Sequence, residues 1–208
     1  MSQPCTRNCT ISQPGEVDQS LGEFWSGSPW DIINRHNLSC FERNRVYLNV
    51  AGENFVDISH LTGADSDGDG RAVVAADFNG DGRVDLAVRQ AGGGPLLLLE
   101  NQFPSQNYLK LTLRGRSSNR LGIGARIDAQ VGERHIVREV YPANGFRGQA
   151  PLVVHLGLAD AGQADRLSIR WPSGAVQELA ALPANHHFVV TEGSEAAEVV
   201  IPGTTIAP

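Results

Sequence analysis

The sequence lacks the features that would place it in several common classes. No apolar run approaches the roughly 18–20 residues of a membrane-spanning helix, so we expect no transmembrane helix. The net charge is −6, without a basic stripe, which argues against a nucleic-acid partner because phosphates attract clustered lysine and arginine. Lys110 is the only lysine among 17 lysine and arginine residues. The 208-residue chain, 41% hydrophobic, is typical of a globular protein with an ordinary core.

Catalytic and metal-binding signatures are also scarce. Cysteine is confined to Cys5, Cys9 and Cys40, a spacing that fits neither a zinc site nor a c-type haem site. The simplest arrangement is one disulfide and one leftover thiol. The adjacent His186 and His187 are interpreted as part of a surface loop rather than a metal site, because neighbours on a strand face opposite sides. No nucleophile motif or phosphate-binding glycine loop is present, so we expect no enzymatic activity.

One acidic stretch, residues 77–85 (Asp-Phe-Asn-Gly-Asp-Gly-Arg-Val-Asp), carries a clear chemical signal and is called the acidic loop below. Its oxygen donors have the spacing of an EF-hand-like calcium loop, with glycine at position six for the sharp turn. We predict a Ca²⁺ site formed by Asp77, Asn79, Asp81, the backbone carbonyl of Arg83, and Asp85. Position twelve is Val88 instead of the glutamate of a true EF-hand, and short apolar runs flank the loop, so it should join two strands. The alternative is a solvated Asn-Gly/Asp-Gly hairpin turn without a metal.

A second acidic cluster precedes the first. Asp65, Asp67 and Asp69 repeat the one-three-five spacing, but Val73 occupies position nine and supplies no side-chain oxygen. We interpret this cluster as a polar turn rather than a second calcium site. One of its carboxylates could still complete the first site.

Short runs of alternating polar and apolar residues indicate an all-β chain without a sustained helical period. Residues 46–49 and 55–58 should form a hairpin, followed by strands on both sides of the acidic loop. Beyond residue 104 the regular strand series and its Gly/Pro turns indicate a β-sandwich. The expected strands cover residues 72–76, 86–89, 96–100, 108–114, 125–131, 134–140, 152–158, 165–171, 175–179 and 187–191.

The first strands and the acidic loop resemble a known repeat. Residues 44–49 (Asn-Arg-Val-Tyr-Leu-Asn), 55–57 (Phe-Val-Asp) and 77–86 look like the FG-GAP/VCBS repeat of β-propellers. That resemblance implies a calcium loop between the first two strands of a blade. It also implies that residues 45–60 are the outer strands of one blade and residues 72–101 most of the next. Propellers need about four to eight blades, so the partial blades expose sheet edges that something must cover.

The later strands resemble a second family. Residues 119–126 (Asn-Arg-Leu-Gly-Ile-Gly-Ala-Arg), 155–158 (His-Leu-Gly-Leu) and 169–174 (Ile-Arg-Trp-Pro-Ser-Gly) look like the ASPIC/UnbV domain, with shorter matches at residues 138–140 and 144–146. That domain, shared with cartilage acidic protein, commonly follows FG-GAP/VCBS repeats in secreted proteins. It brings no established catalytic residues. The connection after Gly145 departs from the family pattern.

These observations give a four-part organisation. We predict an irregular cysteine-containing segment over residues 1–42, a blade region over 43–104, a sandwich over 105–192 and a tail over 193–208. The tail is either disordered or adds a strand, which could pair with a neighbouring chain. In the first segment, Trp25 and Trp30 should cover a core edge rather than stack on a sugar, and Asn8 and Asn37 fit the N-glycosylation pattern.

The function expected from the sequence is that of a calcium-stabilised extracellular interaction module, adhesion-type and non-catalytic. The partners would be other protein chains, including copies of itself, or an extracellular glycan. Weak calcium sites of about 10⁻⁴–10⁻³ M suit the outside of the cell, as disulfides do, so we expect an exported protein. The alternatives are a self-assembling subunit of a filament or surface layer that adds strands to its neighbours, and a carbohydrate-binding protein.

Overall fold

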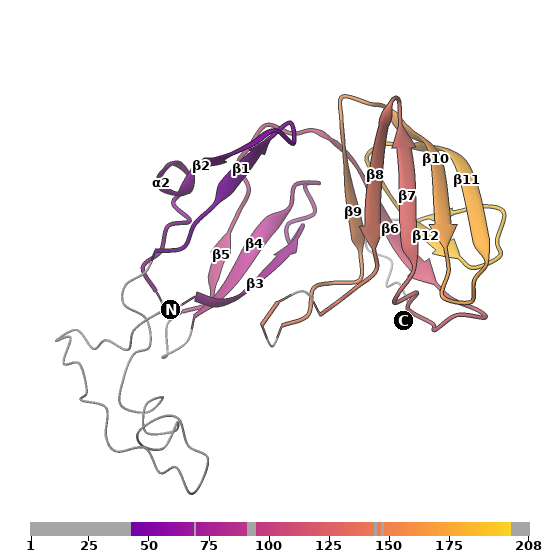
Figure 1. Ribbon diagram of the computed structural model, residues 1–208, viewed down its shortest axis with the longest axis horizontal. Helices are drawn as coiled ribbons and strands as arrows, with labels where there is room; N and C mark the ends of the chain where they lie inside the picture. The colour runs from indigo at the N-terminus through magenta and orange to yellow at the C-terminus, as the bar shows by residue number, and fades with distance from the viewer. Residues whose placement is uncertain (1–42, 69, 91–94, 144, 147, 201–208) are drawn as a thin grey trace, which may run out of the picture. The chain divides into compact units, whose positions relative to one another are not determined.

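The computed structural model describes residues 43–68, 70–90, 95–143, 145–146 and 148–200 (Figure 1). Two compact units divide the chain. The first comprises Met1–Val73 and Ala87–Leu99, and the second comprises Val74–Leu86 and Glu100–Pro208. The acidic loop therefore belongs to the second unit. The predictions for the cysteines, for Trp25 and Trp30, and for Asn8 and Asn37 lie outside the described residues. In the described part of the chain, no helix is long and apolar enough to cross a membrane.

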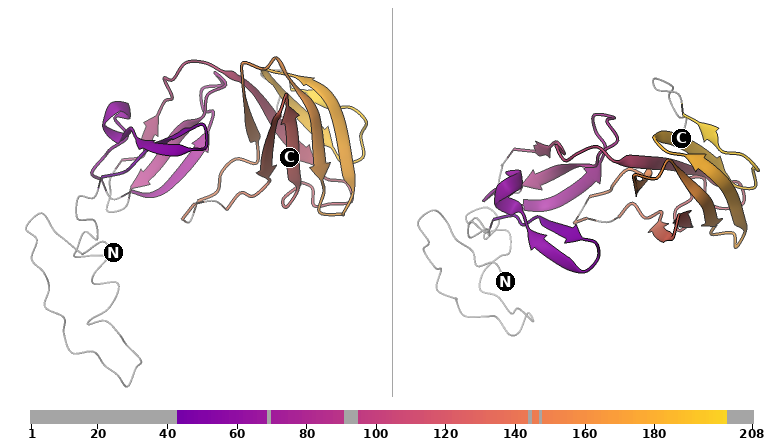
Figure 2. Two further views of the ribbon diagram at one scale, coloured as in Figure 1. Left: turned by 45° about the horizontal axis from the view of Figure 1, so that its top comes forward. Right: turned by 90° about the horizontal axis from the view of Figure 1, so that it is seen from above.

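The second unit contains two four-stranded sheets (Figure 2). One has the order β11-β10-β7-β8 and the other β13-β12-β6-β9. This arrangement confirms the predicted sandwich and places each predicted strand within a few residues of its observed position. The strands are β6 (Asn107–Arg114), β7 (Arg126–Val131), β8 (Arg134–Glu139), β9 (Val154–Ala159), β10 (Gln163–Arg170), β11 (Val176–Pro183), β12 (His186–Thr191) and β13 (Glu198–Val199).

The sandwich core follows from the period-two pattern of its strands. In β6, Leu109, Leu111 and Leu113 are buried, while the alternate residues point away from the core. Inward-facing Val, Ile, Leu and Phe side chains of β7, β9, β10 and β12 join the same cluster. Trp171 is also buried, and its indole Nε1 donates a hydrogen bond to Gln177 Oε1 at 2.9 Å, so its polar atom is satisfied. This core fixes which side chains of the sheets face outward.

β6 lies between two strands that come from distant parts of the sequence. It pairs antiparallel with β9 and parallel with β12. The register places Lys110 opposite both His155 and His187, so three basic side chains cross the outer face of this sheet in one row. A parallel neighbour requires a long connection, and here the whole of the other sheet lies between β6 and β12 in the sequence.

The tail begins with a strand that pairs within its own chain. β13 lies antiparallel to β12, with Phe188 opposite Val199. Residues 198–199 of the tail thus add a short strand to the chain's own sheet. Residues 201–208 lie outside the described part.

The hairpin β1 (Tyr47–Val50) and β2 (Asn54–Asp57) lies in the first unit, and the three-stranded sheet β3-β4-β5 has strands in both units. The bounds are β3 (Gly70–Ala76), β4 (Asp85–Gln90) and β5 (Leu97–Leu99). Among the described residues, the one element that the sequence pattern did not predict is α2 (Ser59–Thr62), a single turn that begins where the Asp57 carboxylate accepts the Ser59 amide at 3.0 Å. The hairpin exposes large apolar side chains on both strands: Tyr47, Leu48, Val50, Phe55 and Val56.

A buried carboxylate fastens one loop of the sandwich. Glu192, directly after β12, accepts hydrogen bonds from the backbone amides of Arg116, Ser117 and Ser118 at 2.7–2.8 Å. The hydroxyls of Ser118 and Ser173 bond its other oxygen at 3.0 and 2.6 Å. These donors, the Ser118 amide foremost, lower the pKa of Glu192 to about 2. This arrangement, the Glu192 staple, holds the loop after β6 against the sandwich.

Candidate functional site

The acidic loop connects β3 to β4, as predicted. Asp77 follows the last residue of β3 and Asp85 is the first residue of β4. Two glycines turn the chain, because Gly80 and Gly82 have φ values of 80° and 89°, in the left-handed region. A Cβ atom added at Gly82 would lie 2.0 Å from the Tyr108 ring. The sandwich residue Tyr108 therefore packs directly on the loop backbone.

Asp77 holds the turn together from its first position. Its Oδ1 accepts the Gly80 amide at 2.7 Å and its Oδ2 accepts the Gly82 amide at 2.8 Å. Only 3% of the side chain is exposed, and Oδ2 also accepts a hydrogen bond from the Lys110 ammonium. Burial alone would raise the pKa of Asp77, but the bonds from Lys110 and the two amides outweigh burial and hold it below its usual value. The carboxylate is thus ionised and balanced by a cation.

Asn79 and Asp81 form the exposed part of the loop. Asn79 Oδ1 accepts the Asp81 amide at 3.0 Å, and Asn79 Nδ2 donates to Asp81 Oδ2 at 2.9 Å and to Glu100 Oε1 at 3.1 Å. Asp81 Oδ1 accepts the Arg83 amide at 2.8 Å, and the Arg83 guanidinium binds Asp81 Oδ2. The Arg83 amide is the largest cause of a lowered pKa for Asp81.

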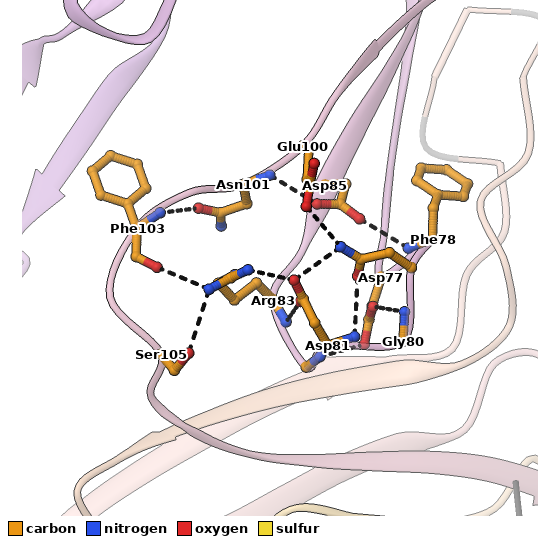
Figure 3. A network of polar contacts seen from close by, with 12 residues as sticks. Asp77, Phe78, Gly80, Asp81, Arg83, Asp85, Glu100, Asn101, Phe103 and Ser105 are labelled. Carbon is orange, nitrogen blue, oxygen red and sulfur yellow. Dashed lines mark hydrogen bonds and ion pairs between the residues drawn. The ribbon is translucent and has the colours of Figure 1, made fainter.

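Asp85 closes the far end of the loop (Figure 3). It is 2% exposed, and its two oxygens accept the Phe78 amide at 3.0 Å and the Asn101 amide at 2.8 Å. One carboxylate therefore joins the start of the loop to the segment that enters the sandwich. All four predicted side-chain donors lie in the same loop, and each is held by hydrogen bonds.

The row of basic residues on β12, β6 and β9 lies against this loop. Lys110 reaches Asp77, and His155 donates from Nε2 to the Gly82 carbonyl at 2.8 Å. Tyr108 stacks on His155 with 5.5 Å between ring centroids, and the Lys110 nitrogen lies 5.2 Å from the centre of the Tyr108 ring. Burial is the main cause of a lowered pKa for His155, and the charge of Lys110 acts in the same direction. His155 is therefore neutral near pH 7.

His187 completes the row. Its Nε2 lies 2.8 Å from the Thr112 hydroxyl, and burial together with the Lys110 charge lowers its pKa. His186 and His187 both lie in β12, so the interpretation of the pair as a surface loop is wrong, although the strand predicted over residues 187–191 already included His187. Beside the row is a hollow of about 580 Å³, whose lining includes Asp77, Lys110, Arg138, Tyr141 and His187.

Sequence reasoning identified the donors of the acidic loop but missed the residues that contact them from the sandwich: Tyr108, Lys110 and His155. Lys110 had one usable signal, since it is the single lysine and lies on the outward-facing side of an alternating strand. No sequence signal pairs it with Asp77, because the two are 33 residues apart and meet only through the fold.

The second acidic cluster has a different role. Asp65, in the first unit, accepts a hydrogen bond from Arg43 Nη1 at 2.9 Å and lies 2.7 Å from His60 Nδ1. Asp69 lies outside the described residues. The carboxylate of Asp65 thus has polar partners of its own in Arg43 and His60, as expected of a polar turn.

Calcium fits the donor chemistry of the acidic loop. Its donors are hard oxygens, and each of Asp77, Asn79, Asp81 and Asp85 has an oxygen that accepts a single hydrogen bond among the described residues, which leaves a lone pair for a ligand. A cation already sits at position one, in the form of the Lys110 ammonium. The oxygens are not gathered around one point, however, since no three His, Cys, Asp or Glu side chains of the described residues form a metal-holding group. An ion would need Asp77 and Asp81 to exchange their present cationic partners.

Comparison with family models gives two adjacent matches. Residues 31–88 match the FG-GAP-like repeat, and residues 115–197 match the ASPIC and UnbV model. No curated protein matches the chain. FG-GAP-like repeats often bind calcium, and both kinds of domain are typical of secreted proteins and extracellular binding modules. The chain therefore contains an FG-GAP-like repeat followed by an ASPIC/UnbV domain, as its motifs indicated.

Proposed function

We propose that the chain is a non-catalytic, extracellular interaction module whose acidic loop binds calcium and is thereby stabilised against the sandwich. The observation that carries the proposal is the acidic loop itself: four oxygen donors at EF-hand spacing, on a turn that packs against Tyr108 and His155. Calcium would be held by Asp77, Asn79, Asp81, Asp85 and the carbonyl of Arg83. Its chemistry there is charge neutralisation of clustered carboxylates.

The titratable groups near the loop are each bound to another part of the loop or the sandwich, which supports the non-catalytic part of the proposal. Asp77 is ion-paired with Lys110, His155 donates to a backbone carbonyl, and His187 is bonded to Thr112. Each of these contacts joins parts of the loop and the sandwich, so we infer that the three groups hold the loop and the sheet in place rather than act as catalytic bases.

The apolar surface of the β1–β2 hairpin supports the interaction part. Tyr47 and Phe55 are 55% and 69% exposed, and their neighbours on the hairpin are also apolar. Clustered exposed apolar side chains mark interaction surfaces in soluble proteins. We infer that the partners are other protein chains.

Thermal unfolding in calcium and in EGTA tests the proposal. With a dissociation constant of about 1 mM, 10 mM CaCl₂ stabilises the folded state by about 1.4 kcal/mol. For a chain of this size that raises Tm by roughly 3–6 °C. Asp81→Asn should lose most of this rise. The matched control Asp160→Asn, which makes the same charge change on an exposed residue, should keep it.

Magnesium at the same concentration controls for ionic strength. Equal melting curves in calcium, magnesium and EGTA would refute calcium binding by the acidic loop.

A further inference from the structure

We propose that Lys110 is a tethered cation that competes with calcium for Asp77 and so sets the calcium affinity of the acidic loop. This inference rests on the proposed calcium binding and adds a residue that no ligand pattern contains. Its basis is one contact: the Lys110 ammonium lies on Asp77 Oδ2, with side chains 15% and 3% exposed. Asp77 supplies the first calcium ligand, so the ammonium already binds a carboxylate that the ion would need.

Competition follows from simple electrostatics. Oδ2 of Asp77 already accepts the Gly82 amide and the Lys110 ammonium, which fills the two acceptor positions of that oxygen. A divalent ion within coordination distance of the same carboxylate would lie only a few ångströms from the ammonium, and like charges at that range repel strongly in a part-buried setting. The two cations therefore exclude each other.

The surroundings of Lys110 favour its present position. The Lys110 nitrogen lies 5.2 Å from the centre of the Tyr108 ring, whose π face attracts the ammonium. His155 and His187 flank Lys110 on the neighbouring strands and are kept neutral, so neither repels it. Asp77 is the anion that Lys110 contacts. A calcium ion must overcome this stabilised pair before it can bind.

The structure also offers a place for the displaced side chain. Lys110 lines the hollow of about 580 Å³ beside the row, so its flexible stem can swing the ammonium away from Asp77 into open space. Arg83 differs, because it belongs to the loop and its guanidinium binds Asp81, which is more exposed. Displacing Lys110 from Asp77 therefore contributes most of the free-energy cost that lowers the calcium affinity of the loop.

The first experiment compares calcium affinities by isothermal titration for the wild type, Lys110→Met and Arg126→Met. Met keeps the apolar stem of Lys110 but removes its charge. Arg126 is a matched control, since it loses the same charge from a solvent-exposed pair with Glu139 on the other sheet. We expect Lys110→Met to bind calcium at least about tenfold more tightly than the wild type, because a buried pair no longer has to be broken. Arg126→Met should stay within about twofold.

The second experiment observes the exchange directly in the wild-type protein. Lys110 is the only lysine, so ¹³C-lysine labelling gives one side-chain NMR signal per methylene position. Added calcium should move the Lys110 ε-methylene signal toward that of a free lysine, with the same midpoint as the titration heat. This readout also serves if Lys110→Met fails to fold without calcium.

The outcomes separate the two proposals. If neither the wild type nor Lys110→Met binds calcium, the proposed function fails. If both bind with equal affinity, or the lysine signal stays fixed while calcium saturates the wild type, calcium binding stands and the role of Lys110 is overturned.

Discussion

The packing of Tyr108 on the acidic loop gives a quantitative prediction through two neighbouring glycines. Gly80 and Gly82 both have positive φ, so replacing either by alanine strains the backbone by about 1–2 kcal/mol. They differ in what the new methyl group meets. At Gly80 no atom lies within 4 Å, whereas at Gly82 the methyl would lie 2.0 Å from the Tyr108 ring. Gly82→Ala should therefore carry an additional overpacking cost of about 1–3 kcal/mol.

The Tyr108 ring cannot yield cheaply. It stacks on His155 and lies beneath the Lys110 ammonium, so moving it disturbs both contacts. We expect Gly80→Ala to lose about 1–2 kcal/mol of unfolding free energy and Gly82→Ala about 2–5 kcal/mol. For a chain of this size the difference between the variants corresponds to roughly 2–12 °C in Tm.

Thermal and urea unfolding followed by circular dichroism measure these losses. A Tyr108→Ala background provides the control, because without the ring Gly82→Ala should cost no more than Gly80→Ala. The coupling between positions 82 and 108 should then be about 1–3 kcal/mol. Equal destabilisation by Gly80→Ala and Gly82→Ala in the parent protein would refute the packing of the sandwich on the loop.

Two further predictions concern the sandwich. Glu192→Gln should lower Tm at pH 7, and its difference from the wild type should shrink as the pH falls from 4.5 towards 2. The folded-state pKa of about 2 lies below the ordinary 4.5, so the staple's contribution is present above pH 4.5 and is lost as Glu192 is protonated. Glu195→Gln, at an exposed position, is the control, and a pH-independent difference would contradict this account. Leu156→Ala, in the core, should cost about 2–5 kcal/mol in urea unfolding, whereas Val176→Ala, 63% exposed, should cost under about 0.5 kcal/mol.

The sequence predicted the strands well because their signal is local. Leu109, Leu111 and Leu113 alternate with polar residues, and that pattern alone assigns one face of β6 to the core. The acidic loop was equally visible, since its donors and glycines lie within nine consecutive residues. The unpredicted turn α2 depends on one side-chain contact between Asp57 and Ser59, which is too short for a periodic pattern.

The contacts around the loop could not be predicted because they depend on distant strand pairing. Lys110 faces outward by alternation, but its neighbours His155 and His187 are fixed only by the register of β9 and β12. The strand predicted from residue 187 omitted His186 for the same reason, since the pairing with β6 that extends β12 to His186 is non-local. The Glu192 staple likewise joins residues more than 70 positions apart.

The packing of Gly82 against Tyr108 has a consequence for how such chains can be recombined. Gly82 lies in the FG-GAP-like match and Tyr108 just before the ASPIC/UnbV match, so their contact links one module to the segment that leads into the next. A repeat with a side chain at position 82 would fit this sandwich less well, and a sandwich without a ring at 108 would lose one of its contacts with the loop. We therefore expect transplantation of the two modules as a pair to preserve this packing. Chimaeras that exchange only one of them should need compensating changes at these two positions.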